Sequence, residues 1–283
     1  MVGNKAIHIL GTIIAALQEA VFPTRCLVCR AFLKSRQQKS LSLDFQDRAS
    51  FNCPNRLLFQ SLMTGFLCPT CIKGFVPVKP PICSVCGIMF KSREGEDHVC
   101  GECLTSPKKF RISRSPGIYD KEFMAVIHCL KYKGKIQLAR PLGMLLFSAF
   151  ISLWGINSID IIVPVPLHIK RFRKRGFNQA YLLVRDWKQI AENLNVRLPD
   201  ISIDTNVLIR NRWTDPQTGL DRKKRMTNIK NAFSVNDKAI IKNKKILLID
   251  DVYTTGATVN ECAKALLRGK AEYVDVLTLA RAV

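Results

Sequence analysis

Two neighbouring carboxylates, Asp250 and Asp251, follow a run of four aliphatic residues at 246–249. Such a run is typical of a strand buried on both faces of a parallel sheet, and open α/β sheets bind ligands beyond the carboxyl ends of their strands. Small and hydroxyl residues at 254–258 come next, before a helical pattern. Their backbone N–H groups and the start of that helix would form an anion cradle. Carboxylates that can hold hydroxyl groups, placed beside an anion cradle, indicate a ribose phosphate.

Residues 246–258 resemble the thirteen-residue phosphoribosyl-pyrophosphate (PRPP) signature of type I phosphoribosyltransferases, in which hydrophobic residues precede two acids and a small-residue Thr/Gly loop. The run is not a Walker A loop, because no Gly-Lys-Thr follows. A buried strand with an Asp-rich turn and no ligand is the alternative. The resemblance implies that Asp250 and Asp251 are a catalytic pair, which holds the ribose hydroxyls directly or through Mg²⁺. It also implies that PRPP is bound by Val252, Tyr253, Thr254, Thr255, Gly256, Ala257 and Thr258.

A second predicted strand, residues 159–166, ends in prolines and is followed by a dense run of cations. Five of the six residues from 170 to 175 are Lys or Arg, which predicts a loop that contacts pyrophosphate or a nucleic-acid backbone. A solvated run of charges is the alternative. For His168, a phosphate contact or a satisfied loop position ranks above proton donation. At this strand end we expect PRPP contacts from Pro166, Leu167 and His168, and basic contacts from Arg171, Arg173 and Arg175.

The polar segment at 210–228 contains glycine and proline and separates two predicted strands. In type I phosphoribosyltransferases the corresponding insertion closes over PRPP and excludes water from the reactive centre. The resemblance therefore implies a mobile loop that includes Gln217 and Arg225, and a disordered charged loop is the alternative. Lys131 stands at the cationic end of the helix predicted for 119–132 and belongs to the same expected set of basic contacts.

Eight of the eleven cysteines fall into four Cys-x-x-Cys pairs, a spacing that suits tetrahedral zinc, because each pair supplies two thiolates from one tight turn. Pairing in sequence order closes the shorter loops, so we favour it over a site built from the two middle pairs. Four thiolates leave no open position, so both metals would be structural and His98 a bystander. The predicted zinc ligands are Cys26, Cys29, Cys68 and Cys71 in the first site, and Cys83, Cys86, Cys100 and Cys103 in the second.

The composition of this 283-residue chain constrains its partners and its compartment. A net charge of +22 points to a polyanionic partner, such as nucleic acid, a phosphorylated substrate or an anionic surface; solubility alone is the weaker explanation. Paired cysteines with an odd total argue against a secreted disulfide framework, so we expect a cytoplasmic protein. The apolar run at 6–17 is too short to span a bilayer and is interpreted as a helix that ends at Pro23.

Alternating strand and helix patterns predict an α/β fold with a mostly parallel sheet, of the type I phosphoribosyltransferase kind, covered by helices on both faces. The expected order is an N-terminal helix at 1–23, a double zinc-ribbon region at 24–104 with an insertion around 30–67, and a phosphoribosyltransferase-like domain at 105–283. In that last domain the predicted helices are 119–132, 137–153, 177–193 and 258–268, and the predicted strands are 159–166, 207–209, 231–235, 246–250 and 273–279.

These features together resemble the ComF family, whose members join double zinc ribbons to a phosphoribosyltransferase-like domain and are associated with natural DNA uptake and transformation. The resemblance runs through nearly the whole chain. Besides the cysteines and the PRPP signature it rests on Leu-Lys-Tyr-Lys-Gly at 130–134, Pro-Val-Pro-Leu-His at 164–168, Arg-Gly-Phe-Asn-Gln-Ala at 175–180 and Gln-Thr-Gly-Leu at 217–220. The departure is the long insert between Cys29 and Cys68.

The family resemblance implies a protein of natural transformation that binds PRPP with Mg²⁺, holds two structural zinc ions and contacts single-stranded DNA on a basic surface. Further DNA-uptake or recombination proteins are expected partners. Phe172, Phe177 and Trp213 lie among cations, where bases could stack. The alternative is a catalytically active phosphoribosyltransferase with a small-molecule acceptor and no direct DNA role, although no acceptor is legible in the sequence.

Overall fold

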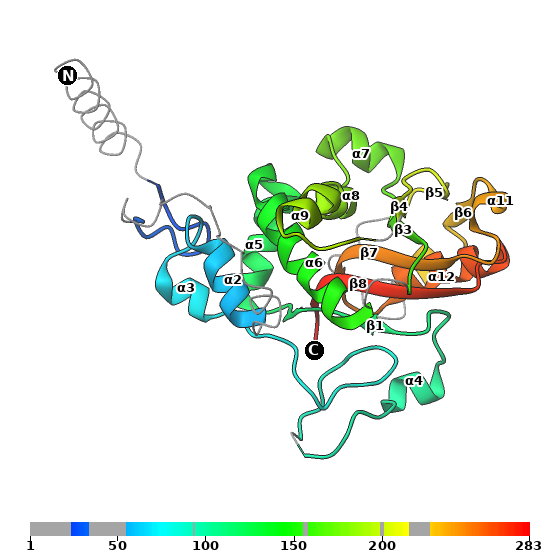
Figure 1. The fold of residues 1–283 in the computed structure, drawn as a ribbon, viewed down its shortest axis with the longest axis horizontal. Helices are drawn as coiled ribbons and strands as arrows, with labels where there is room; N and C mark the ends of the chain where they lie inside the picture. Colours follow the sequence, from blue (N-terminus) through cyan, green and yellow to red (C-terminus); the bar gives the residue numbers. More distant parts are fainter. Residues whose placement is uncertain (1–23, 34–54, 93, 155–157, 199–200, 215–226) are drawn as a thin grey trace.

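A parallel sheet lies at the centre of the protein (Figure 1). The computed structural model describes residues 24–33, 55–92, 94–154, 158–198, 201–214 and 227–283. Within these residues the strand order is β1-β8-β7-β3-β4, β2 also pairs with β8, and every pair of this sheet is parallel. The strands are β1 (Ser113–Arg114), β2 (Gly117–Ile118), β3 (Ile161–Pro164), β4 (Ser202–Ile203), β7 (Lys245–Tyr253) and β8 (Tyr273–Arg281).

The central strand β7 is buried on both faces, as its aliphatic run predicts. Residues 246–249 are all 0% exposed, and their side chains alternate between two cores. Leu247 contacts one core and Leu248 the other, because successive side chains of a strand point to opposite faces. The register between β3 and β7 sets Pro164 beside Ile249. The residues that follow these two strands therefore emerge at the same edge of the sheet.

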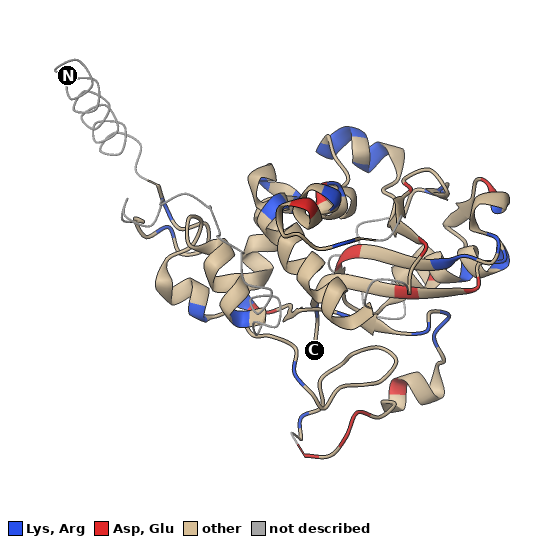
Figure 2. Ribbon diagram, in the orientation of Figure 1, with Lys and Arg blue, Asp and Glu red and all other residues tan. Residues whose placement is uncertain are grey.

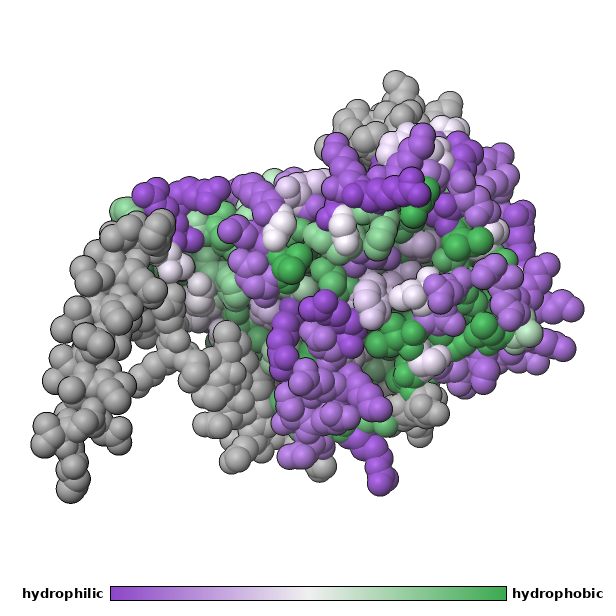
Figure 3. Space-filling view, turned by 90° about the horizontal axis from the view of Figure 1, so that it is seen from above, coloured by the Kyte–Doolittle hydropathy of each residue, from purple (hydrophilic) through white to green (hydrophobic). Residues whose placement is uncertain are grey.

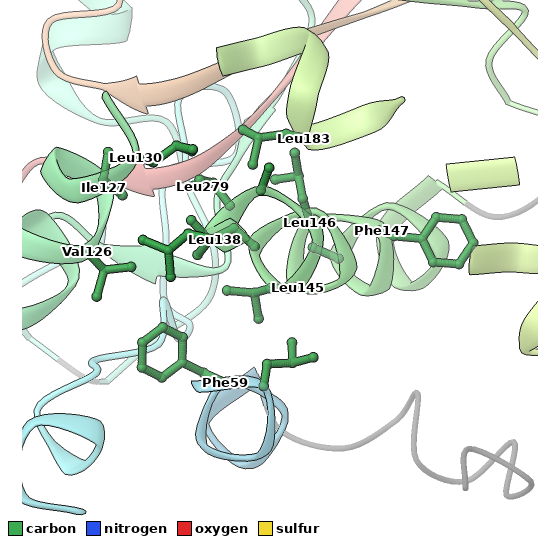
Figure 4. Close-up of a cluster of buried hydrophobic side chains, with 14 of the residues drawn as sticks. Phe59, Val126, Ile127, Leu130, Leu138, Leu145, Leu146, Phe147, Leu183 and Leu279 are labelled. Atoms are coloured by element: carbon green, nitrogen blue, oxygen red, sulfur yellow. The ribbon is translucent and has the colours of Figure 1, made fainter. Parts of the chain in front are cut away.

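A layer of helices covers one face of the sheet, with the apolar helix α6 at its centre. Figure 4 shows Leu145 and Leu146 of α6 in this core, together with Leu183 and Leu279, and all four side chains are almost fully buried. The helices of this layer are α5 (Lys121–Tyr132), the 3₁₀ turn η3 (Ile136–Leu138), α6 (Ala139–Trp154), α8 (Gln179–Val184) and α9 (Trp187–Asn193).

The stretch Ile136–Trp154, which comprises η3 and α6, is the one helical stretch among the described residues that is long and apolar enough to cross a membrane. Of its apolar window, 61% is buried inside the protein, and α6 packs against α2, α8 and β8. Core packing therefore accounts for its apolar composition.

The second face of the sheet is covered by α12 (Ala257–Arg268), with α11 (Lys238–Ile241) and an antiparallel hairpin of β5 (Leu208–Arg210) and β6 (Phe233–Val235) beside it. Val259, Cys262 and Leu266 lie one helical turn apart and are buried, so α12 presents a single apolar face to the sheet. The predicted α/β fold, with a parallel sheet between two helical layers, is confirmed.

The cysteine-rich region contains a turn at 24–33, in which Arg25 and Phe32 form an isolated β-bridge, and the helices α2 (Asn55–Met63), α3 (Pro69–Lys73) and α4 (Gly101–Thr105). Phe59 of α2 stacks on Phe75 at 4.1 Å between ring centroids, and both rings meet the edge of Phe123 from α5. Residues 55–63 were expected to belong to an insertion, yet they form a helix whose apolar side continues the main core (Figure 4).

The structure corrects three local expectations. The cations at 170–175, predicted as a loop, form the helix α7 (Ile169–Arg175). The helix predicted for 177–193 is broken between α8 and α9. β7 continues to Tyr253, so the two aspartates lie within the strand rather than after it. The helix predicted for 1–23, much of the insertion predicted around 30–67, and the expected loop residues Gln217 and Arg225 lie outside the described residues.

Capping explains why residues 169–175 form a helix. None of the residues of α7 is buried, so burial of apolar side chains does not stabilise it. The His168 side chain accepts a hydrogen bond from the backbone N–H of Lys170 at 3.2 Å. Gly176, at φ 82°, ends the helix in the left-handed conformation that favours glycine. Caps at both ends, with cations in the last turn next to the negative end of the helix dipole, stabilise a helix that has no apolar face.

Candidate functional site

A cleft of about 710 Å³ opens at the edge of the sheet where β3 and β7 end. Figure 3, a view onto the face that carries α7, shows hydrophilic side chains beside apolar ones across this face. Five segments supply the walls: helix α5 with Tyr119 before it, the residues after β3, helix α7, the segment from β5 to Trp213, and the turn from β7 into α12. From the predicted site these segments bring together Lys131, Pro166, Leu167, Arg171, Arg175, Asp250, Asp251, Val252, Tyr253, Thr254, Gly256, Ala257 and Thr258.

The two aspartates of β7 differ in their surroundings. Asp251 is buried, and its Oδ1 lies 2.8 Å from Nζ of Lys131, which comes from α5. Asp250 accepts a hydrogen bond at Oδ1 from the backbone N–H of Asp251 at 2.8 Å. Burial, followed by repulsion from Asp251, raises the pKa of Asp250 to about 7. Burial opposes the charge of Lys131, but attraction to Asp251 outweighs it and raises the pKa of the ammonium.

Oδ2 of Asp251 is buried and has no hydrogen-bond partner among the described residues. A buried carboxylate oxygen without a partner is costly, so its presence in a cleft indicates a place for a ligand. Carboxylate oxygens are the donors that Mg²⁺ prefers, and the metal is commonly held by one or two of them together with phosphate oxygens of a substrate. Asp250 and Asp251 therefore fit a Mg²⁺ ion that arrives with a phosphorylated ligand.

The turn between β7 and α12 is shaped by Gly256, which has φ 72° and stands at the N-terminus of α12. A Cβ atom added at this position would collide with the phenol ring of Tyr253. Oγ1 of Thr255 accepts a hydrogen bond from the backbone N–H of Ala257 at 3.3 Å, although Thr255 itself does not line the cleft. The first N–H groups of a helix have no partner within the helix, so this turn can bind an anion.

Helix α7 places cations on the opposite wall, with Arg171, Lys174 and Arg175 lining the cleft. Arg171 lies over the ring of Trp213 at 5.5 Å and donates to the carbonyl oxygen of Thr214 at 3.1 Å. Arg175 lies over the ring of Tyr132 at 5.3 Å. These contacts hold two guanidinium groups on aromatic faces at the mouth of the cleft.

Two expected members of this set lie outside the cleft. Arg173 is exposed on α7 and does not line the cleft, and His168 caps the helix with its ring edge to face with that of Trp213. Burial and the nearby guanidinium of Arg210 lower the pKa of His168. His168 therefore caps α7, and a phosphate contact by this residue stays a prediction.

Helix α5 and Tyr119, which lies just before it, supply cleft residues that sequence reasoning missed. Tyr119, just before α5, shares a hydrogen bond of 2.8 Å between its Oη and Nε2 of His128. The rings of His128 and Tyr132 meet edge to face at 5.4 Å between centroids. Burial lowers the pKa of His128. A signal was present, because His128, Lys131 and Tyr132 are three and four residues apart and must share one face of the helix.

Arg210 of β5 is a second missed residue of the cleft. Its guanidinium lies over the ring of Phe233 at 5.4 Å and bonds Oγ1 of Thr214. Burial, with repulsion from Arg171, lowers its pKa to about 10. No local pattern marks this arginine, because its place in the cleft depends on how the hairpin packs against the sheet.

The eight paired cysteines form two groups of four, in the pairing by sequence order. In each group the ligand atoms all lie within 4.8 Å of one another. Cys29 and Cys68 are 3.6 Å apart at their sulfurs, and Cys86 and Cys100 are 3.7 Å apart. Zinc–sulfur bonds of about 2.3 Å in a tetrahedron place sulfurs roughly 3.8 Å apart, so both groups fit a zinc ion.

In each group one thiol ionises more readily than an ordinary cysteine, whereas burial raises the pKa of Cys71, Cys86 and Cys103. Burial opposes ionisation of Cys83, but the backbone N–H groups of Cys100 and Cys86 outweigh it and lower its pKa to about 6. In the first group, N–H groups of Cys68 and Cys29 likewise overcome burial and lower the pKa of Cys26 to about 7. His98 lies outside the second group and stacks on Phe90 at 3.9 Å, as expected of a bystander.

One family model matches the C-terminal third of this chain. The family model "Phosphoribosyl transferase domain" matches residues 188–282. Among solved structures the chain is similar to the glutamine PRPP amidotransferase of B. subtilis, complexed with ADP and GMP. That similarity has a TM-score of 0.28 and 16% identity, and it covers 63% of this chain and 30% of the other. At that level it says nothing about function.

The similarity to curated proteins is closer and spans most of both chains. The chain is 33% identical over 226 residues to competence protein F of Haemophilus influenzae, covering 76% of this chain and 90% of that protein. It is 31% identical over 219 residues to the DNA utilization protein YhgH of Escherichia coli K12, with the same coverage. It is 27% identical over 234 residues to competence protein ComFC of Bacillus subtilis, covering 80% and 88%. With its paired cysteines, parallel sheet and cleft, the chain belongs to the ComF family.

Proposed function

We propose that this protein binds PRPP with Mg²⁺ in the cleft and acts, in the cytoplasm, on single-stranded DNA during DNA uptake. One observation carries the first half of this proposal. The aspartate pair, the turn at Gly256 and the cations of α7 line a single cleft. A ligand that satisfies all three walls needs hydroxyl groups, a terminal phosphate and a further cluster of negative charge. PRPP has that combination of groups.

Each wall has a distinct role in this proposal. Asp250 and Asp251 hold the ribose hydroxyls, and the N-terminus of α12 with Thr254 and Thr258 holds the 5′-phosphate. Arg171, Lys174 and Arg175 neutralise the pyrophosphate from the opposite wall. Mg²⁺, when bound with PRPP, supplies further positive charge to the pyrophosphate oxygens.

Calorimetric titration with PRPP and Mg²⁺ tests the site. We expect Asp250→Asn and Asp251→Asn to weaken binding at least tenfold, because charge-assisted contacts of about 1.5–3 kcal/mol are removed. Asp237→Asn is the matched control. It neutralises an exposed carboxylate that caps α11, and asparagine caps a helix as well as aspartate does. Unchanged affinity in both site variants would reject the cleft as the PRPP site.

The DNA half of the proposal is supported by α7 itself. Figure 2 shows that this helix is largely basic. Lys170 and Arg173 are exposed on it, and Phe172 is 44% exposed between them. Trp213 is 39% exposed and lies under Lys170 and Arg171. Cations that contact phosphates beside aromatic faces that stack bases are the usual elements of single-strand binding. The DNA-related names of the curated relatives favour the same role.

A second candidate function is transfer of the phosphoribosyl group to a small-molecule acceptor. The cleft extends past the aspartates to the wall formed by Tyr119, His128 and Tyr132, where Tyr132 is 61% exposed. Aromatic rings on that wall suit a planar acceptor, because planar groups stack on them. Pyrophosphate release from PRPP, measured across candidate acceptors with and without single-stranded DNA, separates the two functions. Release that depends on an acceptor and not on DNA would favour the transferase.

A further inference from the structure

Arg281, at the end of β8, lies buried between the second cysteine group and the cleft. Arg281 is only 4% exposed. Nη2 donates to the sulfur of Cys86 at 3.3 Å. Its guanidinium carbon lies over the ring of Tyr253, 4.2 Å from the centroid. One side chain therefore contacts both a predicted zinc ligand and a residue of the PRPP signature.

The charge of Arg281 requires an anionic partner, because an unpaired charge inside a protein is costly. Its Nε and Nη1 are buried without hydrogen-bond partners among the described residues. Among these residues the guanidinium group therefore donates a hydrogen bond only from Nη2, to the sulfur of Cys86. Four thiolates around one zinc ion leave a net charge of about −2. The filled second site would thus supply the negative charge that Arg281 lacks.

Tyr253 lies between Arg281 and the turn at Gly256 and contacts both. Its ring is 2% exposed, with Arg281 over one face and the edge of Phe110 against it at 6.1 Å between centroids. The phenol lies directly against Gly256, where an added Cβ would collide with it. The position of the Tyr253 ring therefore determines the space available to the turn at Gly256.

We propose that Arg281 is a positioning residue that couples the second cysteine group to the anion-binding turn. Metal held by Cys83, Cys86, Cys100 and Cys103 keeps Arg281 in place, Arg281 keeps the ring of Tyr253 in place, and the ring supports the turn at Gly256. Metal in the second site would then do more than stabilise the fold, because it would also control the affinity of the turn at Gly256 for a phosphate group of the ligand. The ligand in this statement rests on the proposed function, whereas the coupling does not.

Such coupling is reciprocal by thermodynamic linkage. If bound metal increases the affinity of the turn for a phosphate ligand, the ligand must increase the affinity of the second site for metal by the same factor. Residues that support metal ligands through one hydrogen bond typically change metal affinity by about ten- to a hundredfold when they are replaced. The same range is the effect expected here for Arg281.

The test compares Arg281→Lys with Arg114→Lys in the full-length zinc-loaded protein. Arg114 also joins the second cysteine region to the sheet, through Nη2 to the carbonyl oxygen of Ser84 at 3.0 Å, but no ring contact links it to Tyr253. Lysine keeps the charge at both positions and loses the planar group that lies on the Tyr253 ring. The readouts are zinc release to a chromogenic chelator, backbone hydrogen exchange at 253–258, and PRPP affinity.

We expect Arg281→Lys to accelerate zinc release and exchange at 253–258 by about ten- to a hundredfold, and Arg114→Lys to leave exchange at 253–258 unchanged. Equal effects of the two variants would overturn the coupling, because loosening of the whole cysteine region would then explain them. Wild-type rates in Arg281→Lys would overturn it as well. Failure of wild-type protein to bind PRPP would reject the proposed function instead, while zinc release and exchange would still decide the coupling.

A second measurement needs no substitution at Arg281. Cys103→Ser opens the second site, whereas Cys29→Ser opens the first site at its exposed cysteine. Exchange at 253–258 is expected to rise in Cys103→Ser and to stay at the wild-type rate in Cys29→Ser. Equal exchange at 253–258 in both variants would contradict a path through Arg281.

Discussion

Lys131 and Asp251 form a buried ion pair inside the cleft, with Nζ 2.8 Å from Oδ1 and side chains that are 14% and 6% exposed. The lysine comes from the end of α5 and the aspartate from the middle of the sheet. In the absence of ligand, Lys131 is the cation that balances the charge of Asp251. A Mg²⁺ ion that binds Asp251 would lie close to the ammonium group of Lys131. Changes to this pair should therefore alter both the stability of the protein and ligand binding in the cleft.

Loss of Lys131 should destabilise the folded protein. Lys131→Met leaves Asp251 as a buried charge without its partner, and breaking a buried pair from one side costs about 3–5 kcal/mol. The free energy of unfolding in urea measures this loss. The double variant Lys131→Met/Asp251→Leu removes both charges, and we expect it to regain most of the lost stability. We expect it not to bind PRPP, because Asp251 is missing. A single variant as stable as wild type would contradict the importance of the pair.

PRPP binding should strengthen as the pH rises through about 7. Burial and the neighbouring Asp251 raise the pKa of Asp250 to about 7, and the ionised form is the one that holds Mg²⁺ and hydroxyl groups. Calorimetric affinities between pH 5.5 and 8.5 measure the effect. PRPP phosphates titrate near pH 6 themselves, so Asp250→Asn is the control. The part of the pH dependence that disappears in this variant belongs to Asp250, and no difference between the two profiles would refute the assignment.

The same raised pKa fixes the sign of a stability effect in the ligand-free protein. The folded protein holds the proton of the Asp250 carboxyl group more tightly than the unfolded chain does, so this proton stabilises the fold. The stabilisation is fully present below the ordinary aspartate pKa of 3.8. It is lost as the pH rises through about 7. Stability of Asp250→Asn should therefore fall less than that of wild type between pH 4 and 8, in urea unfolding at each pH.

Gly256→Ala should damage the cleft more than an equivalent change elsewhere. Gly256 has φ 72°, and an added Cβ would collide with the ring of Tyr253. Gly95→Ala is the matched control, since Gly95 has φ 89° with nothing within 4 Å of an added Cβ. Backbone strain alone costs ~1–2 kcal/mol. We expect Gly95→Ala to show only that loss in thermal unfolding, and Gly256→Ala to lose PRPP affinity too. Retained PRPP affinity in Gly256→Ala would contradict this account of the turn.

Exposed cations of α7 should account for part of the salt dependence of single-strand binding. Replacing Lys170 and Arg173, which do not line the cleft, by alanine removes up to two phosphate contacts, at about 0.7 units of slope each, so log affinity against log salt should flatten by about 1.4. The control replaces Lys242 and Lys244, two exposed lysines just before the start of β7. Equal flattening in both double variants would indicate a diffuse charge effect rather than contacts at α7.

Much of the fold follows from local pattern. The aliphatic residues 246–249 predict a strand buried on both faces, and the structure buries all four. The spacing of the cysteine pairs predicts two groups of four, and the sulfurs lie accordingly. These inferences succeed because a buried strand and a metal-binding turn both depend on residues that are near each other in sequence.

Helix α7 shows where local pattern misleads. Five cations in six residues carry no apolar periodicity, so the segment was predicted as a loop. Its helical form depends on the cap at His168 and the left-handed residue Gly176. The broken helix at 177–193 and the short strand β4 escaped prediction for a similar reason, since packing against the sheet decides where such short elements begin and end.

The sequence by itself indicated the family, the resemblance of 246–258 to a PRPP signature and the four Cys-x-x-Cys pairs, because each is a run of neighbouring residues whose spacing controls local geometry. Only the tertiary structure decided that Lys131 meets Asp251, that His128 and Tyr119 form the far wall of the cleft, and that Arg281 joins Cys86 to Tyr253. Those contacts join residues far apart along the chain. They depend on the register of parallel strands and on the way helices settle onto the sheet, and no local spacing encodes either.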